Sequence, residues 1–288
     1  MAVSDVKIDD YKRDGYVIIE HAFKEREVDE MKAHIMDIIR ELHCDDAQKV
    51  VFSTTNKMQP SDEYFLESVD KIRFFFEKEA FDSQQKLIYP VHKALNKIGH
   101  ALHWLDPVFG RCSHSSPIKQ VLRALNFRDP VIVQSMYIFK QPGIGGEVTE
   151  HIDRTFLDVE PIDSLIGIWI ALDDATENNG CLQFIPGSHK DLSVSYRFQR
   201  TGTPDGPAMT FVGECPSHDN SKFVPVPVKK GSMVLIHGAV LHKSQKNSSE
   251  ESRHSFALHI VDKENSKWSP FNWLQEMDEY EFPSIVIS

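Results

Sequence analysis

The chain has 288 residues, of which 41% are hydrophobic and 26% are charged, and its formal net charge is -11. This composition is typical of a soluble globular protein with a substantial core. The negative charge argues against a nucleic-acid surface, which needs clustered lysine and arginine, and no apolar run approaches the roughly 18 residues of a membrane span. The N-terminus lacks the apolar segment of a secretory signal. We expect a cytoplasmic protein that binds neither nucleic acid nor membrane, and the sequence indicates no protein partner.

The spacing of the cysteines also favours a cytoplasmic location. Four of them stand far apart without a Cys-x-x-Cys pair: Cys44, Cys112, Cys181 and Cys215. In a chain without a signal sequence this spacing predicts reduced thiols, and neither a disulfide framework nor a zinc site.

The first third of the chain is predicted to be helical. Residues 25–43 place apolar side chains at helical spacing along one stripe, with charged residues elsewhere. Residues 68–81 follow in this helical third, and residues 87–109 again carry apolar side chains that fit one helix face. These last apolar positions are Val91, Leu95, Ile98 and Leu102.

From Pro130 onward the pattern changes to short β-type runs separated by turns. They cover residues 131–140, 165–174, 181–187, 209–213, 223–228, 231–242 and 254–261. Many short strands at close spacing indicate an antiparallel sandwich or barrel. We expect a mainly β protein with flanking helices and a single domain over residues 1–288. Its helical N-terminal layer would span about 1–125 and its β core about 126–265.

A His-x-Asp pair stands near the middle of the chain, in the stretch EVTEHIDRTF. On a strand, His151 and Asp153 would point to the same face. Two histidines and one carboxylate, with open positions opposite, are the ligand set of non-haem Fe(II) oxygenases. A surface loop with a hydrogen-bonded His and Asp would show the same pair. A third ligand would have to come from another strand, and the candidates are His237, His242, His254 and His259.

Arg253 begins a second pattern of interest. Strand alternation places it on one face with Ser255, Ala257 and His259, so that a cation is followed by small residues. This leaves room for a small anionic ligand, and arginine grips a carboxylate through two parallel hydrogen bonds. An edge strand with a solvent-facing arginine would also fit.

These features form an ordered set: His151-x-Asp153, NNGCLQFIPGSH at 178–189, His242-x-Ser244, and Arg253. Further blocks are DKIRFFFEK at 70–78, NKIGHALH at 96–103, VIVQSMYIFKQP at 131–142 and WSPFNWL at 268–274. Together they resemble the phytanoyl-CoA dioxygenase family. The family fold is a double-stranded β-helix, a cupin-like jelly roll, with added helices.

The resemblance implies a set of ligands and a reaction. Fe(II) would be held by His151, Asp153 and His242. The cosubstrate 2-oxoglutarate would chelate the iron, with its C5 carboxylate on Arg253 and Ser244. Other residues that match the lining of the cosubstrate pocket are Lys97, Met136 and Trp169. The implied enzyme couples oxidative decarboxylation of 2-oxoglutarate to succinate and CO2 with hydroxylation of a small organic or acyl substrate, using O2, with ascorbate as a supporting reductant.

Some points depart from the family pattern or stay open. The family has glutamine where this chain has Ile152, and Arg154 adds a charge beside it. His237 is an alternative third ligand, and His259 is expected to line the pocket without binding iron. The alternative function is a catalytically idle jelly-roll protein that binds metal and keto acid as a sensor or scaffold. A halogenase is disfavoured because Asp153 occupies the position that such enzymes leave free for halide.

Overall fold

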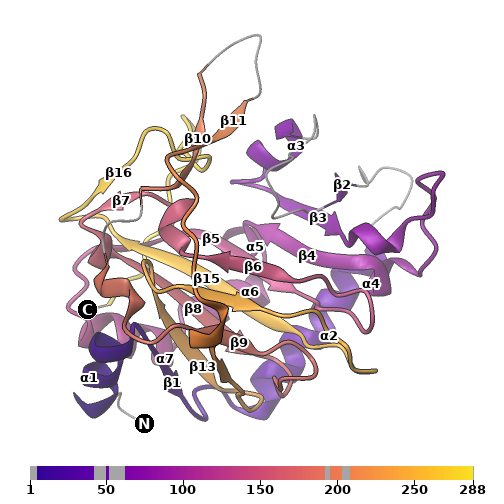
Figure 1. Cartoon of the computed structure of the whole chain (residues 1–288), viewed down its shortest axis with the longest axis horizontal. Coiled ribbons are helices and arrows are strands. Elements are labelled where there is room, and N and C mark those ends of the chain that lie inside the picture. The colour runs from indigo at the N-terminus through magenta and orange to yellow at the C-terminus, as the bar shows by residue number, and fades with distance from the viewer. Residues whose placement is uncertain (1–4, 42–49, 52–61, 192–194, 203–207, 288) are drawn as a thin grey trace.

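The computed structural model describes residues 5–41, 50–51, 62–191, 195–202 and 208–287. Two β-sheets form its centre (Figure 1). The larger sheet has, among the described residues, the order β1 (Tyr16–Ile19), β13 (Met233–His237), β8 (Leu165–Ala171), β15 (Ser255–Asp262), β5 (Pro130–Ile138), β4 (Leu95–His100), β3 (Ile72–Phe76) and β2 (Val50–Val51). The smaller sheet has the order β12 (Val224–Val226), β9 (Leu182–Phe184), β14 (His242–Ser244) and β6 (Val148–His151). Neighbouring strands are antiparallel except β2 and β3.

The helices and two short strand pairs surround these sheets. The helices are α1 (Asp5–Asp14), α2 (Glu25–Glu41), α3 (Asp62–Leu66), α4 (Val91–Ala94), α5 (Leu102–Leu105), α6 (Pro107–Ser113) and α7 (Ser116–Ala124). The short pairs are β10 (Arg197–Arg200) with β11 (Met209–Val212), and β7 (Val159–Glu160) with β16 (Lys267–Trp268). The β10–β11 hairpin rises at the top of the view, opposite α3 (Figure 1). No helix among the described residues combines the length and apolar character needed to cross a bilayer.

Alternation along the central strands sorts the core into two sides. On β8, Ile168 and its even-numbered neighbours pack with the buried stripe of α2, whereas Trp169 packs with Phe184 of the smaller sheet. On β15, Leu258 lies on the helix side and Ala257 on the side of the smaller sheet. Two antiparallel sheets packed face to face, with helices over the outer face of the larger one, form the expected jelly-roll core.

The helix predicted from residue 25 is confirmed as α2, which ends at Glu41. Glu27 Oε2 accepts a 2.8 Å hydrogen bond from the backbone N–H of Lys24 at its start. Its buried residues are Val28, Met31, Ile35 and Ile39. The last two residues of the predicted helix lie outside the described residues.

The helices predicted over residues 68–81 and 87–109 are wrong in their central parts, where the chain forms strands β3 and β4. For residues 87–109 the cause is a β-bulge in β4. Phe75 pairs with Lys97 but Phe76 pairs with Leu95, so one residue of β4 is skipped. Leu95 and Ile98 therefore reach the same core cluster although they are three residues apart, which imitates helical spacing.

The β-type runs are confirmed as strands, with one informative division. The run at 231–242 forms β13, turns over four residues and continues as β14 in the other sheet. At this turn Gly238 lies so close to Leu165 that a Cβ would approach that side chain to 2.8 Å. The tight crossing brings His242 from the larger sheet to the smaller one.

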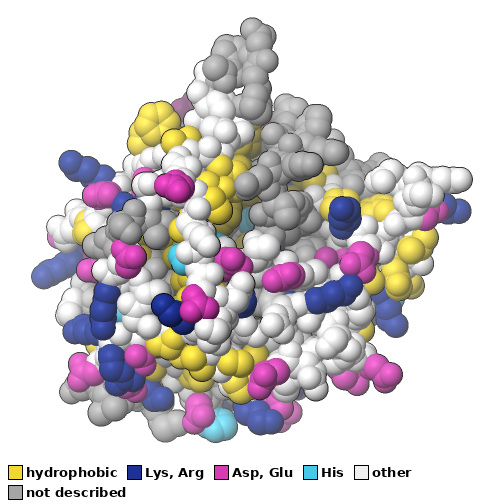
Figure 2. Space-filling view, viewed as in Figure 1, with side chains coloured by type: hydrophobic (Ala, Val, Ile, Leu, Met, Phe, Trp, Pro, Cys, Tyr) yellow, Lys and Arg dark blue, Asp and Glu magenta, His cyan; other side chains and the backbone are white. Residues whose placement is uncertain are grey.

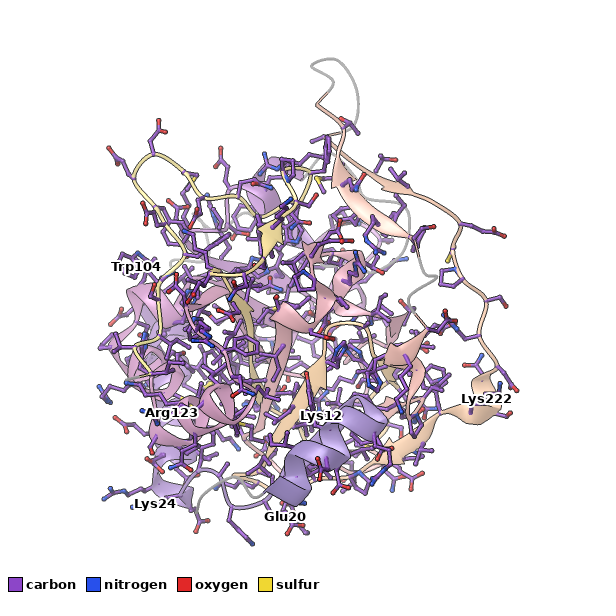
Figure 3. The ribbon with its side chains drawn as sticks, turned by 90° about the vertical axis from the view of Figure 1, so that its left-hand side faces the viewer. Lys12, Glu20, Lys24, Trp104, Arg123 and Lys222 are labelled. Atoms are coloured by element: carbon purple, nitrogen blue, oxygen red, sulfur yellow. The ribbon has the colours of Figure 1, made fainter. Side chains whose placement is uncertain are left out.

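The outer surface carries the charged side chains of several separate elements. Lys12 of α1, Lys24 before α2, Arg123 of α7 and Lys222 are seen on different parts of it in Figure 3. Arg123 Nε donates a 2.6 Å hydrogen bond to the carbonyl of Ile287, which ties the C-terminal segment to α7. Among the cysteines, Cys112, Cys181 and Cys215 are free thiols, and Cys44 lies outside the described residues.

Candidate active site

Three side chains of types that can bind a metal ion meet inside the jelly roll. His151 ends β6, Asp153 begins the 3-10 helix η2 (Asp153–Thr155), and His242 begins β14. His151 and His242 are directly opposite in the β6–β14 register. Their Nε2 atoms lie 3.8 and 3.7 Å from Asp153 Oδ1, and one ligand atom of each residue lies within 4.8 Å of the other two. Of the four histidines that the sequence left open as the third member, His242 is the one that joins His151 and Asp153.

Asp153 reaches the cluster by another route than predicted. The strand ends at His151, and Asp153 already belongs to η2, so the two do not share a continuous strand face. Arg154 N donates to the carbonyl of Gly238 at 2.9 Å, which fixes η2 against the turn that precedes β14. The departures from the family pattern are also placed: Ile152 is buried, and Arg154 forms ion pairs with Asp158 and Glu160.

Backbone carbonyls orient both imidazoles. His151 Nδ1 lies 2.8 Å from the carbonyl of Thr149, and His242 Nδ1 lies 3.0 Å from that of Val240. A carbonyl accepts hydrogen bonds only, so each Nδ1 carries the proton and each Nε2 presents its lone pair. Such contacts on the far nitrogen are usual for metal-binding histidines.

The charges in the cluster suit a cation. Burial lowers the pKa of His151 to about 4, with nearby His242 as the next cause, so this imidazole is neutral at pH 7. Burial alone would raise the pKa of Asp153, but the imidazoles of His259, His242 and His151 outweigh burial and lower it. The carboxylate is therefore ionised and the His151 imidazole beside it is neutral, which is the state in which these groups bind a metal.

The surroundings of the carboxylate also fit a metal ion. Asp153 is 5% exposed, and its Oδ2 is buried without a hydrogen-bond partner. Gly167 on β8 makes room for it, because a Cβ there would lie 3.1 Å from Oδ2. A buried ionised carboxylate is costly unless it is paired or coordinates a metal. The two imidazoles and this carboxylate fit a divalent ion such as Fe(II).

Arg253 is buried in the same cavity. Its exposure is 2%, its Nη1 donates a 3.0 Å hydrogen bond to Ser255 Oγ, and its guanidinium lies 5.1 Å from the centre of the Trp169 ring. Burial lowers its pKa to about 10, so it stays cationic at neutral pH. Its Nε has no hydrogen-bond partner. Arg253 is therefore not a solvent-facing residue of an edge strand. It is a buried cation in the cavity that His151, Asp153 and His242 also line.

The remaining residues of the predicted cosubstrate pocket line this cavity too. They are Lys97, Met136, Trp169 and Ser244. Lys97 Nζ lies 3.7 Å from Met136 Sδ, while Ser244 Oγ donates a 2.8 Å hydrogen bond to the carbonyl of Gly180. Lys97 was weighed as a residue of a helix, but it is on β4, inside the fold.

Lys140 is a lining residue that the sequence did not single out. It is 2% exposed, and its Nζ donates a 2.7 Å hydrogen bond to the carbonyl of Gly146. Burial lowers its pKa to about 7, followed by repulsion from Arg253. The only local signal is a lysine at the end of an apolar strand, which the fold places inside the cavity.

The cavity lined by His151, Asp153 and His242 has a volume of about 1160 Å³. It is bordered by strands of both sheets and by aromatic side chains from outside them, including Phe65, Phe156, Phe211 and Trp273. In the space-filling view, hydrophobic and histidine side chains lie in the hollow below the β10–β11 hairpin (Figure 2). The volume leaves room for an organic substrate beside a small keto acid.

The other histidines have separate surroundings. His237 ends β13, and its Nε2 lies 2.9 Å from Asp163 Oδ1, away from the three ligand atoms. His189 lies in the short 3-10 helix Ser188–Lys190. His100 is on β4 and hydrogen-bonds Ser68, so its predicted helical position is wrong; His103 is on α5. Of the FFF run at 74–76, Phe75 lines the cavity while its neighbours join the core.

Comparison with known sequences decides the family. Residues 11–255 match the family described as Phytanoyl-CoA dioxygenase (PhyH). The chain belongs to the phytanoyl-CoA dioxygenase family. As a member it is a 2-oxoglutarate-dependent dioxygenase, which confirms the resemblance noted from the motifs. The matched residues include α2 to α7 and the strands of both sheets except β15, of which they include only Ser255.

Close relatives align with the family member described here over almost their whole length. The phytanoyl-CoA dioxygenase domain-containing protein 1 homolog of Caenorhabditis briggsae is 50% identical over 286 residues, which cover 98% of this chain and 99% of the relative. The Danio rerio phytanoyl-CoA dioxygenase domain-containing protein 1 is 45% identical, with 98% coverage of each chain. Both relatives carry the name phytanoyl-CoA dioxygenase domain-containing protein 1, and both align with nearly all of this chain.

Solved structures share the fold of this family member at low identity. The non-heme alpha ketoglutarate dependent carbocyclase SnoK has a TM-score of 0.63 at 18% identity, covering 93% of this chain and 87% of SnoK. EctD from S. alaskensis, with 2-oxoglutarate and 5-hydroxyectoine, has a TM-score of 0.60 at 18% identity, covering 91% and 77%. These likenesses confirm the jelly-roll fold.

Proposed function

We propose that this dioxygenase binds Fe(II) through His151, Asp153 and His242 and couples oxidative decarboxylation of 2-oxoglutarate, to succinate and CO2, with hydroxylation of a small organic or acyl substrate. The observation that carries the proposal is that the buried Arg253 lines the same cavity as these three side chains. The three side chains would bind the metal, and Arg253 would bind the distal carboxylate of the keto acid. We further propose that the whole chain acts as one domain, because α2 shares its buried core with β8 and β15.

The protein groups would have distinct tasks. The three ligands would leave coordination positions for a keto acid and O2, and bound Fe(II) would supply the activation of O2. Arg253, braced by Ser255 and the Trp169 ring, would bind the C5 carboxylate. The aromatic side chains around the opening would exclude water and hold the substrate over the metal.

Several features favour this function over the idle scaffold. The three proposed metal ligands and the proposed basic anchor line one cavity, and EctD, which shares the fold, has been crystallised with 2-oxoglutarate and with iron. A sensor would need the same binding groups but no room for a third molecule. The cavity of about 1160 Å³ offers that room.

The test is isotope transfer. The Fe(II) protein is supplied with ascorbate, 2-oxoglutarate and 18O2, with and without pools of small organic and acyl compounds. We expect slow succinate release alone, faster release with one pool, and one 18O atom in a hydroxylated product. Succinate itself takes up one atom of each 18O2, so stimulated succinate release without 18O in any other product would contradict hydroxylation.

Lys97 gives a prediction on stability. Burial lowers its pKa from 10.5 to about 7, which corresponds to about 5 kcal/mol at 1.36 kcal/mol per pKa unit. Its contacts with the rings of Phe65 and Phe75 offset about 1–2 kcal/mol of that. We expect Lys97→Met to raise the free energy of unfolding of the metal-free protein by about 3 kcal/mol at pH 7, measured by urea denaturation.

The pH dependence identifies the cause of this gain. The unfolded lysine keeps its proton up to about pH 10.5 and the folded one loses it near pH 7. The destabilisation is therefore complete below pH 7 and disappears as the pH rises toward 10.5. The gain in the free energy of unfolding from Lys97→Met should therefore shrink over that range. A gain of equal size at pH 7 and pH 10 would show that packing, and not the buried charge, is responsible.

A further inference from the structure

The two oxygens of Asp153 have different surroundings. Oδ1 faces the Nε2 atoms of His151 and His242 at 3.8 and 3.7 Å. Oδ2 is turned the other way, toward Gly167, and His259 Nε2 lies 3.3 Å from it. Oδ2 has no hydrogen-bond partner at this distance and angle, so a small tilt of the carboxylate would bring it into line with that nitrogen.

His259 is itself held by Gln134. The two residues are paired directly in the β5–β15 register, and both are buried. Gln134 Nε2 lies 2.8 Å from His259 Nδ1. An amide NH₂ only donates hydrogen bonds, so Nδ1 must act as the acceptor and the single proton of the neutral ring is on Nε2. This protonated nitrogen is the one that lies 3.3 Å from Asp153 Oδ2.

We propose that Gln134 and His259 form a positioning pair that keeps Asp153 a ligand through one oxygen. Gln134 sets the tautomer of His259, and His259 Nε2–H donates to Oδ2, which leaves Oδ1 for the metal. The inference rests on the proposed metal site. A carboxylate bound through both oxygens would take a coordination position that the keto acid and O2 require. Hydrogen bonds from outside the ligand set commonly orient metal-binding groups in this way.

Substitutions of His259 test the donor. In His259→Leu the donor is lost, and we expect Co(II) and Fe(II) affinity, measured by anaerobic titration, to fall about 10- to 100-fold. Glutamine places its amide nitrogen near the position of Nε2, and asparagine near that of Nδ1. His259→Gln should therefore recover most of the affinity and His259→Asn should not. Equal affinities in the glutamine and asparagine variants would overturn the proposal.

His254→Leu is the matched control. His254 precedes the same strand and is half-buried, and its Nδ1 hydrogen-bonds Tyr137 Oη at 2.7 Å, outside the cavity. Its loss should leave metal affinity unchanged even if the melting temperature falls. The melting temperature of each metal-free variant separates weakened folding from weakened binding. An equally large fall in metal affinity in His254→Leu would mean that His259→Leu acts through general destabilisation. That result would overturn the positioning role of His259.

The tautomer can be read directly, without activity. In the long-range 1H–15N spectrum of Zn(II)-loaded wild type, with His259 assigned from its absence in His259→Gln, we expect a protonated Nε2 and an unprotonated Nδ1. Gln134→Leu should mix the two tautomers and weaken Zn(II) binding several-fold. A protonated Nδ1 in wild type would overturn the inference. Wild type that binds no metal would instead overturn the proposed metal site itself, so the two failures are distinguishable.

Discussion

Arg253→Ala should weaken 2-oxoglutarate binding by about 30-fold to several thousand-fold. Arg253 is fully buried and cationic at neutral pH, so its removal would leave the C5 carboxylate of the keto acid buried without a partner. Truncating one member of such a pair costs about 2–5 kcal/mol, at about 1.4 kcal/mol per tenfold change in affinity. The measurement is a titration of anaerobic Fe(II) protein with 2-oxoglutarate, followed by the metal-to-ligand absorbance band.

Two comparisons make this result specific. Arg253→Lys should recover part of the affinity, because an ammonium restores the charge but neither the two parallel hydrogen bonds nor the full contact with Trp169. Pyruvate carries the same chelating atoms without the distal carboxylate, so its weak binding should change much less. Equal losses for both acids would mean that Arg253 only supports the barrel. An unchanged 2-oxoglutarate affinity would move the anchor to another cation, with Lys97 as the next candidate.

Alanine substitution of any one metal ligand should reduce turnover to background. The ligand atoms of these three side chains lie within 4.8 Å of one another. Each of the variants His151→Ala, Asp153→Ala and His242→Ala would leave only two protein ligands. Fe(II) affinity should fall sharply in each variant, as measured by anaerobic calorimetry, and succinate release should fall with it. Iron at saturating concentration should not restore normal turnover.

His237→Ala is the control for this series. Its imidazole contacts Asp163 and the ring of His189, so its removal should lower stability while Fe(II) binding and succinate release are retained. Retained turnover in His242→Ala, together with loss in His237→Ala, would move the third ligand to His237. That result would contradict the placement of His242, rather than His237, beside His151 and Asp153.

Much of the β core follows from the local sequence. The run on β8 is apolar on both faces, with Ile168 toward the helices and Trp169 toward the smaller sheet, and β15 places apolar residues such as Leu258 toward the helices. Short apolar runs between turns are typical of strands covered on both sides. The face shared by Arg253, Ala257 and His259 was predicted from alternation alone, and all three line the cavity.

What the sequence did not predict depends on register and burial. The bulge that brings Leu95 and Ile98 to one face of β4 imitates a helix, and the pairing that creates it involves a strand twenty residues earlier. Gln134 and His259 are 125 residues apart in the chain, so their contact requires the register of β5 and β15. Lys140 likewise gives no local sign of burial. Such relations arise from tertiary packing, which local patterns do not encode.

A single-turnover experiment tests the central claim most directly. Wild-type protein loaded anaerobically with one equivalent each of Fe(II) and 2-oxoglutarate is mixed with O2-saturated buffer, and succinate is quantified against Asp153→Ala and a protein-free control. We predict succinate from the wild type, approaching one per iron when a stimulating compound is present, and only the background of the protein-free control from Asp153→Ala. Wild type that binds both the metal and the keto acid but forms no succinate would instead establish an idle binding protein.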